Sequence, residues 1–225
     1  MWIEVRDIHK HYGPVKANNG LSLKIAPGRA HGILGENGAG KSTLMKILAG
    51  FTQKTSGTIL LNGKPARYTN PSQAAKCGIG MLYQDPLDFP SLSVLENFRI
   101  GLVNALPLKK RHAKKRFREN ADSLHFSLDP DALVKSLTIG ERQQLELLRL
   151  LAMGANALIL DEPTTGISST QKETLLKALK ELAAQGKSII LVSHKLEDVE
   201  ALCETVTVLR QGEISGEMDA PCAGG

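Results

Sequence analysis

The strongest chemical signal in the sequence is a glycine-rich loop that ends in lysine and serine. Residues 35–42 read GENGAGKS, the pattern GxxxxGK(S/T), and they stand between an apolar run and a helical pattern. Glycines let backbone N–H groups turn toward phosphate oxygens, and the start of a helix adds positive potential. Lys41 would contact the β- and γ-phosphates, and Ser42 would bind Mg²⁺. The residues expected to bind a nucleoside triphosphate are Gly35, Glu36, Asn37, Gly38, Ala39, Gly40, Lys41, Ser42 and Thr43.

A pair of carboxylates follows a second apolar run, ALIL at 157–160. Asp161 ends that run, and P-loop enzymes use a carboxylate in this position to hold Mg²⁺. Glu162 is next in the chain, so its side chain points elsewhere and can orient or deprotonate a water beyond the γ-phosphate. Two acids at a strand end are also compatible with simple solvation. Together with the phosphate loop they predict a hydrolytic site.

Both motifs need strands and helices to position them. Runs that predict strands occur at 3–8, 21–25, 31–34, 58–61, 79–83, 157–160, 188–192 and 205–209. Helical patterns occur at 41–49, 94–102, 111–126, 140–153, 170–185 and 195–202. The first strands have hairpin-like spacing, whereas later ones alternate with helices. This order predicts an α/β protein with a parallel sheet covered by helices. The region 90–136 holds helices and no convincing strand, so we expect a helical insertion there.

Composition narrows the class of protein. The chain has 225 residues, 42% hydrophobic and 23% charged, which is typical of a folded domain that buries a core. No run of 18 apolar residues occurs and the N-terminus is polar, so we expect neither a membrane span nor a signal peptide. Cys77, Cys203 and Cys222 form no CxxC pattern, which argues against a disulfide framework or zinc site and favours a reducing compartment.

The net charge of +5 has a local origin. Residues 109–118, KKRHAKKRFR, hold seven of the 28 Lys and Arg residues and no acid, while the chain has 23 acidic residues. Apolar residues recur at spacings of three and four from Ala113 to Leu128, which predicts an amphipathic helix with its basic residues largely elsewhere. The segment is therefore either a solvated helix face or a contact for an anionic surface, such as lipid headgroups or an acidic loop. A nucleic-acid binder would show a wider basic footprint.

Five motifs in order now match one family. They are GENGAGKS at 35–42, Gln84 in LYQD, LTIGERQQ at 137–144, LILDEPT at 158–164 and SHK at 193–195. Over residues 3–217 the chain resembles the nucleotide-binding subunit of ATP-binding cassette (ABC) transporters. The resemblance implies a P-loop NTPase core with an antiparallel β subdomain and an inserted α-helical subdomain.

The resemblance also implies domain boundaries. We expect one domain at 1–217, with core and β subdomain at 1–89 and 137–217 and the helical subdomain at 90–136. The small polar residues at 218–225 predict a flexible tail.

Further site residues follow from the resemblance, with ATP and Mg²⁺ as cofactors. Tyr12, in HYG, resembles the aromatic residue that stacks on adenine, although a lone tyrosine is more often a core or surface residue. Gln84 resembles the glutamine that contacts Mg²⁺ or water and couples to the membrane partner, which would complete a metal set with Ser42 and Asp161. His194 resembles the histidine that contacts the γ-phosphate and links it to Glu162, the catalytic base.

The signature segment departs from the family pattern LSGGQ. Thr138 and Gly140 keep the hydroxyl and the unobstructed backbone N–H that bind an anion at a helix start. Glu141 instead places a negative charge where the pattern has an amide, which would weaken contact with phosphates. The resemblance implies that Thr138, Gly140 and Glu141 act in trans, on the nucleotide of a second cassette. The turn at 165–168 (TGIS) replaces the usual SALD, and we expect Ser168 to cap the following helix.

The stretches at 35–50, 78–85 and 193–199 look like the first half of tandem-cassette ATPases that energise uptake of simple sugars or nucleosides. The implied function is the ATPase subunit of an importer, and the alternatives are an exporter's cassette or an ABC ATPase acting on ribosomes. The implied partners are membrane permease subunits, a second cassette (a homodimer or a tandem half) and an extracytoplasmic solute-binding protein; no nucleic acid is expected. The implied location is peripheral, on the cytoplasmic face of the inner or plasma membrane.

Overall fold

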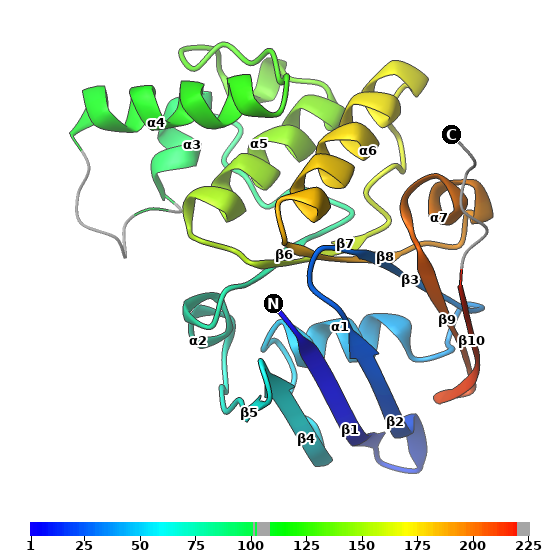
Figure 1. Cartoon of the computed structure of the whole chain (residues 1–225). Coiled ribbons are helices and arrows are strands. Elements are labelled where there is room, and N and C mark those ends of the chain that lie inside the picture. Colours follow the sequence, from blue (N-terminus) through cyan, green and yellow to red (C-terminus); the bar gives the residue numbers. More distant parts are fainter. Residues whose placement is uncertain (101, 103–108, 220–225) are drawn as a thin grey trace.

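A computed structural model describes residues 1–100, 102 and 109–219 (Figure 1). It contains two sheets, with one group of helices packed on the far side of the larger sheet. Between the two sheets lies helix α1 (Lys41–Leu48), which buries Leu44, Met45 and Leu48. These three side chains share a core with residues of both sheets. The phosphate loop is therefore anchored to the centre of the molecule.

The smaller sheet is antiparallel and has the strand order β2-β1-β4-β5. Its strands are β1 (Ile3–Tyr12), β2 (Val15–Ile25), β4 (Ser56–Leu61) and β5 (Lys64–Pro65). Tight spacing allows β1 and β2 to pair as a hairpin, with Tyr12 opposite Val15 at its tip. The hairpin thereby carries Tyr12 away from the core to an exposed position.

The larger sheet has the order β10-β9-β3-β8-β7-β6 and is parallel except for β10. Its strands are β3 (Ala30–Leu34), β6 (Ile79–Leu82), β7 (Ala157–Asp161), β8 (Ser188–Val192), β9 (Thr205–Arg210) and β10 (Glu213–Asp219). Side chains of β7 alternate between two cores: Leu158 and Leu160 face the helices, whereas Ala157 and Ile159 face α1. Burial on both faces explains why these strands are continuous apolar runs.

The remaining helices lie mostly on one side of this sheet (Figure 1). They are α2 (Pro71–Lys76), α3 (Val94–Ile100), α4 (Lys110–Ser123), α5 (Ile139–Ala152), α6 (Ser169–Ala184) and α7 (Leu196–Leu202), with a short 3-10 helix at Val134–Ser136. Helices α3 and α4 pack through Phe98 and Phe117, whose ring centroids are 5.3 Å apart. Between 90 and 136 the described residues contain helices and one isolated bridge, Ser93–Leu133, but no strand.

The structure corrects several expected boundaries. Strands β1 and β2 extend to the hairpin tip, α4 ends at Ser123 rather than at 126, and α3 ends at Ile100, with residue 101 outside the described residues. The tail expected at 218–225 begins too early, because Met218 and Asp219 pair with β9; residues 220–225 lie outside the described residues. Strand β10 was not predicted because it is a polar edge strand held by backbone pairing. Helix α2 was also missed, although Asn70 caps it and Pro71 begins it.

Candidate nucleotide site

The phosphate loop connects the end of β3 to the start of α1, and two of its glycines are required by geometry. Gly35 has φ +152, and a Cβ there would lie 2.3 Å from the carbonyl oxygen of Leu209. Gly40 has φ +102, and a Cβ would lie 2.3 Å from the carbonyl oxygen of Ala17. No other residue fits at these two positions without moving the backbone. The backbone at Leu209 and Ala17 thus leaves room only for glycine at these two loop positions.

Lys41 lies folded across this loop. Its Nζ donates hydrogen bonds to the carbonyl oxygens of Gly35 (2.5 Å) and Glu36 (3.0 Å), and the residue is buried. Two neutral acceptors hold the ammonium group in place without neutralising it. The charge therefore remains available to an anion that enters the loop.

A cavity of about 540 Å³ opens beside the loop. Its lining includes Tyr12, Asn37 to Thr43, Asp161, Glu162 and Gln211. Tyr12 is 49% exposed, with Lys10 Nζ lying 4.7 Å from its ring centroid, so an aromatic face stands at the mouth. The structure therefore brings together the predicted loop, the acidic pair and the predicted stacking residue.

Asp161 ends β7 and reaches the cavity from the sheet. Burial raises the pKa of its carboxyl group, the charge of Glu162 raises it further, and Lys41 and Lys46 lower it in part. A half-buried carboxylate that has no direct ion pair among the described residues favours a bound cation. No cluster of three metal-ligating side chains occurs among the described residues. Mg²⁺ fits this arrangement, because it is usually held by one or two carboxylates together with phosphates and water.

Glu162 and His194 meet at the carboxyl edge of the sheet. His194 Nδ1 lies 2.6 Å from Glu162 Oε1, and Thr165 Oγ1 lies 3.4 Å from the other carboxylate oxygen. The two residues are brought close because β7 and β8 pair in parallel, with Asp161 opposite Val192. Glu162 has φ +49, a conformation that most residues avoid, and its N–H donates to the Val192 carbonyl oxygen at 2.9 Å.

Seven of the predicted site residues are not among those that line this cavity: Gly35, Glu36, Gln84, Thr138, Gly140, Glu141 and His194. Gln84 is exposed in the loop after β6, and its backbone carbonyl accepts a hydrogen bond from Gln143 Nε2 at 3.1 Å. Thr138 and Gly140 stand at the start of α5. Thr138 and Gly140 therefore lie outside their own chain's pocket, which is compatible with the implied action of the signature in trans. Gln84 was expected to complete the metal set with Ser42 and Asp161, but it also lies outside the pocket.

The unusual Glu141 has a local role in the structure. Its Oε2 accepts hydrogen bonds from the Thr138 N–H and hydroxyl group, both at 2.8 Å, which completes a capping box at the start of α5. The carboxylate therefore satisfies the same donors that would otherwise bind an anion. Sequence reasoning identified the charge of Glu141 but not this self-contact.

Gln171 was missed altogether by sequence reasoning. It forms a capping box with Ser168, which confirms the prediction that Ser168 caps α6. Its Nε2 also donates to Thr138 Oγ1 at 2.7 Å and so joins the starts of α5 and α6. The spacing S-x-x-Q at 168–171 is a capping-box signal that the sequence does carry. The contact with Thr138, in contrast, has no local signal.

The DEPT turn is tied to α7 by a second group that was missed. Thr164 Oγ1 donates to Asp198 Oδ2, and Lys172 Nζ lies 2.5 Å from the other oxygen of the same carboxylate. Asp198 is fully buried, so its hydrogen bond to Thr164 holds the turn that follows Glu162 against α7.

The fold and this pocket define a P-loop nucleotide-binding protein. A family model described as ABC transporter matches residues 18–165. The chain therefore belongs to the ABC transporter family, as an ATP-binding cassette.

Solved structures support the fold. The chain is 25% identical, with a TM-score of 0.88, to a nucleotide-free ATP-binding cassette from an ABC transporter, over 98% of this chain and 92% of that one. It has the same identity and TM-score with an ATP-binding cassette in its ADP conformation, over 97% and 91% of the two chains.

Among curated relatives, the nucleoside import ATP-binding protein NupA of Lactococcus lactis is 38% identical over 94% of this chain and 42% of the relative. The arabinose import ATP-binding protein AraG 1 of Burkholderia cenocepacia is 38% identical over 95% and 43%. The ribose import ATP-binding protein RbsA of Caldanaerobacter subterraneus is 40% identical over 95% and 45%. The chain thus spans less than half the length of these relatives.

Proposed function

We propose that the chain binds ATP with Mg²⁺ and hydrolyses it. The observation that carries this proposal is the Glu162–His194 pair at 2.6 Å, beside a cavity that also contains Lys41 and Asp161. In this arrangement a histidine holds the base, and the base lies beyond the phosphate loop. A base in that position can activate water for attack on a terminal phosphate.

Each residue has a distinct role in this proposal. Lys41 exchanges its two carbonyl contacts for phosphate oxygens, and the loop N–H groups bind the remaining oxygens. Glu162 accepts a proton from the attacking water, while His194 holds the carboxylate in position. Tyr12 stacks on the adenine ring. Mg²⁺, when bound, would neutralise charge on the phosphates. Asp161 and Ser42 line the cavity and would hold it, whereas Gln84 would join them only after a movement of its exposed loop.

The complete hydrolytic site is proposed to need a second cassette. Thr138 and Gly140 lie outside their own chain's pocket at the start of α5, where Thr138 is exposed and Gly140 is buried. By the family resemblance they close over the nucleotide of another cassette, either an identical copy or the other half of a longer protein. The chain spans less than half the length of the curated relatives, which is compatible with the arrangement in which the other cassette belongs to the same, longer protein.

Import of a simple sugar or nucleoside through a membrane permease is the proposed use of this ATPase. The support comes from relatives that are named for import of nucleosides, arabinose and ribose. In this proposal the solute is recognised by the permease and not by the cassette. An extracytoplasmic solute-binding protein is a further proposed partner. The cassette would then lie peripherally on the cytoplasmic face of the membrane. None of the helices in the described part of the chain is long and apolar enough to span a bilayer.

A groove near Gln84 offers a place for the permease. It has a volume of about 700 Å³ between α2, the loop after β6 and the end of α5. Exposed apolar side chains line it, among them Phe51, Leu87 and Phe89. Asp88 in the same loop accepts two hydrogen bonds from Arg142 of α5, at 2.6 and 2.9 Å. A permease segment seated here would therefore act on the Gln84 loop and on α5 together.

The decisive experiment measures two properties of the purified chain. Fluorescent ATP should bind in the presence of Mg²⁺, and phosphate release should depend on Glu162. Absence of nucleotide binding would overturn the proposed activity. The import role is tested separately by co-purification: recovery with membrane permease supports it, whereas recovery with ribosomes favours the non-transport alternative. A permease encoded without a solute-binding protein would favour export.

A further inference from the structure

Helix α4 carries a dense group of positive charges that the nucleotide site does not use. Its apolar residues Ala113, Phe117 and Ala121 are buried against the other helices, so its cations face outward. The cations of this segment are Lys109, Lys110, Arg111, Lys114, Lys115, Arg116 and Arg118.

Two of these seven cations have structural partners. Lys114 pairs with Asp131, and Arg116 Nη2 donates to the carbonyl oxygen of Ala152 at 2.7 Å. The five that remain are exposed: Lys109, Lys110, Arg111, Lys115 and Arg118. Among the described carboxylates, Glu119 alone is in ion-pair contact with these five, at 3.7 Å from Lys115. The outer face of α4 therefore keeps most of its charge.

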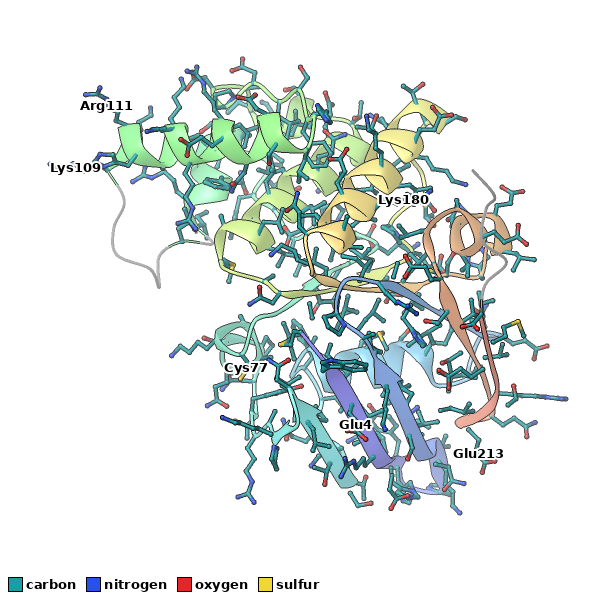
Figure 2. The ribbon with its side chains drawn as sticks, viewed as in Figure 1. Glu4, Cys77, Lys109, Arg111, Lys180 and Glu213 are labelled. Atoms are coloured by element: carbon teal, nitrogen blue, oxygen red, sulfur yellow. The ribbon has the colours of Figure 1, made fainter. Side chains whose placement is uncertain are left out.

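The position of this face relates it to the permease groove. Arg116 is bonded to the last residue of α5, and Met153, the next residue, lines the groove. Ile100, at the end of α3, lines the groove as well. Figure 2 shows Lys109 and Arg111 projecting from the outer end of α4, on the same side of the view as Cys77, which directly follows α2. The Arg116 contact thus joins the helix that carries the basic face to the end of α5 that lines the apolar groove.

We propose that the outer face of α4 binds the anionic headgroups of a lipid bilayer. Four to eight Lys and Arg residues on an amphipathic helix are typical of contact with anionic lipids, to which each contributes about 1 kcal/mol, close to a fivefold factor in affinity. A membrane fits better than nucleic acid, because the cations occupy one helix beside the groove proposed for a membrane protein, and the rest of the chain has more acids than bases. The inference extends the proposed function, but its test needs neither nucleotide nor permease.

The test is co-sedimentation of the chain with vesicles. Vesicles of phosphatidylglycerol and phosphatidylcholine in equal parts should bind the chain at low salt, and vesicles of phosphatidylcholine alone should not. The triple variant Lys110→Gln, Arg111→Gln, Lys115→Gln should lose affinity on the order of 100-fold, because three fivefold factors are removed. Raised salt should release the wild-type chain, since headgroup contacts are screened.

A matched variant controls for net charge. Lys24 on β2, Lys64 on β5 and Arg67 just after β5 are exposed in or beside the smaller sheet, which lies on the opposite side of the larger sheet from α4 (Figure 1). Changing these three to Gln should leave vesicle binding within about twofold, since cations far from the surface contribute little. Equal losses in the two triple variants would overturn the proposal, as would binding to neutral vesicles or no binding to anionic ones. Binding of RNA in place of anionic vesicles would also overturn it. Nucleotide binding by both variants should match wild type, so failure here is distinct from failure of the ATPase.

Discussion

Gln171 Nε2 donates a hydrogen bond to Thr138 Oγ1 at 2.7 Å, and this contact joins the start of α6 to the signature segment, which was predicted to act at a cassette interface. Because the Thr138 oxygen accepts from Gln171, its own proton is directed to Glu141. The signature hydroxyl is thus satisfied within its own chain. Engagement with a phosphate would require Glu141 to release it.

Glu141→Gln should therefore strengthen ATP-dependent association. The change removes a like charge from the phosphate contact, which across an interface is worth several kcal/mol, so we expect at least about tenfold tighter association. The measurement is sedimentation with ATP in a Glu162→Gln background. Equal association by parent and variant would mean that the carboxylate moves aside without hindrance. If Glu141→Gln leaves the chain a monomer, Ser168→Asp is the next change to test, because the family resemblance implies an aspartate there that contacts the partner cassette. Glu200→Gln, at an exposed acid on α7, is the charge-matched control.

Gln171→Leu tests the bridge between α5 and α6. The variant removes the donor to Thr138 and one side of the α6 capping box, so stability should fall by about 0.5–2 kcal/mol. Nucleotide binding by a single chain should not change, because Gln171 does not line the cavity. Thermal unfolding and fluorescent nucleotide binding measure the two effects. A large change in single-chain nucleotide affinity would contradict the placement of the signature outside its own pocket.

Lys41→Ala should lower affinity for Mg-ATP about 10- to 100-fold, as expected for the loss of charge-assisted hydrogen bonds. Lys41 is the single cation within the loop at 35–42, so no neighbour in the loop can replace it. Titration with fluorescent ATP gives the affinity. The loop also loses its bonds to Gly35 and Glu36, and thermal unfolding without nucleotide separates that effect from binding. Wild-type affinity in the variant would refute the site.

Glu162→Gln should keep ATP binding and lose hydrolysis by about 10²- to 10⁴-fold, because an amide of nearly the same shape cannot accept the proton. Phosphate release under single-turnover conditions is the measurement. Glu173→Gln, an exposed acid on α6, serves as the control and should hydrolyse ATP at the wild-type rate. Hydrolysis by Glu162→Gln within twofold of wild type would show that another group is the base.

Asp161→Asn should stabilise the chain in the absence of Mg²⁺ at neutral pH. The pKa of Asp161 is raised by burial and by Glu162, so the folded state binds its proton more tightly than the unfolded state. The free energy of unfolding therefore falls as pH rises from the ordinary carboxyl pKa through the raised one, and it stays lower above it. Asparagine cannot ionise, so the variant avoids the free-energy cost of a charged carboxylate at this position. Each kcal/mol of unfolding free energy regained raises Tm by about 2–4 °C. The same variant should lose Mg²⁺-dependent tightening of ATP binding. A lower Tm would contradict the assigned cause.

The described structure reproduces most predicted elements, and the errors have identifiable causes. Central strands such as β7 and β8 were predicted because burial on both faces demands a continuous apolar run. Strand β10 carries no such pattern, since an edge strand with exposed side chains is held by its neighbour's backbone. Helix α2 has only six residues, too short for a periodic pattern, and its cap was the one usable signal.

The sequence by itself determined the chemistry of the nucleotide site. The loop at 35–42, the pair Asp161–Glu162 and the cap at Ser168 are local features, because a few consecutive residues dictate their backbone shape and their polar groups. The family resemblance already linked His194 to Glu162, and the tertiary structure supplies the reason, because two parallel strands end in register. Only the tertiary structure decided the contact between Thr138 and Gln171, which forms because α5 and α6 begin side by side. Such contacts depend on how the elements pack, and packing joins residues across spans that carry no periodic or spacing signal.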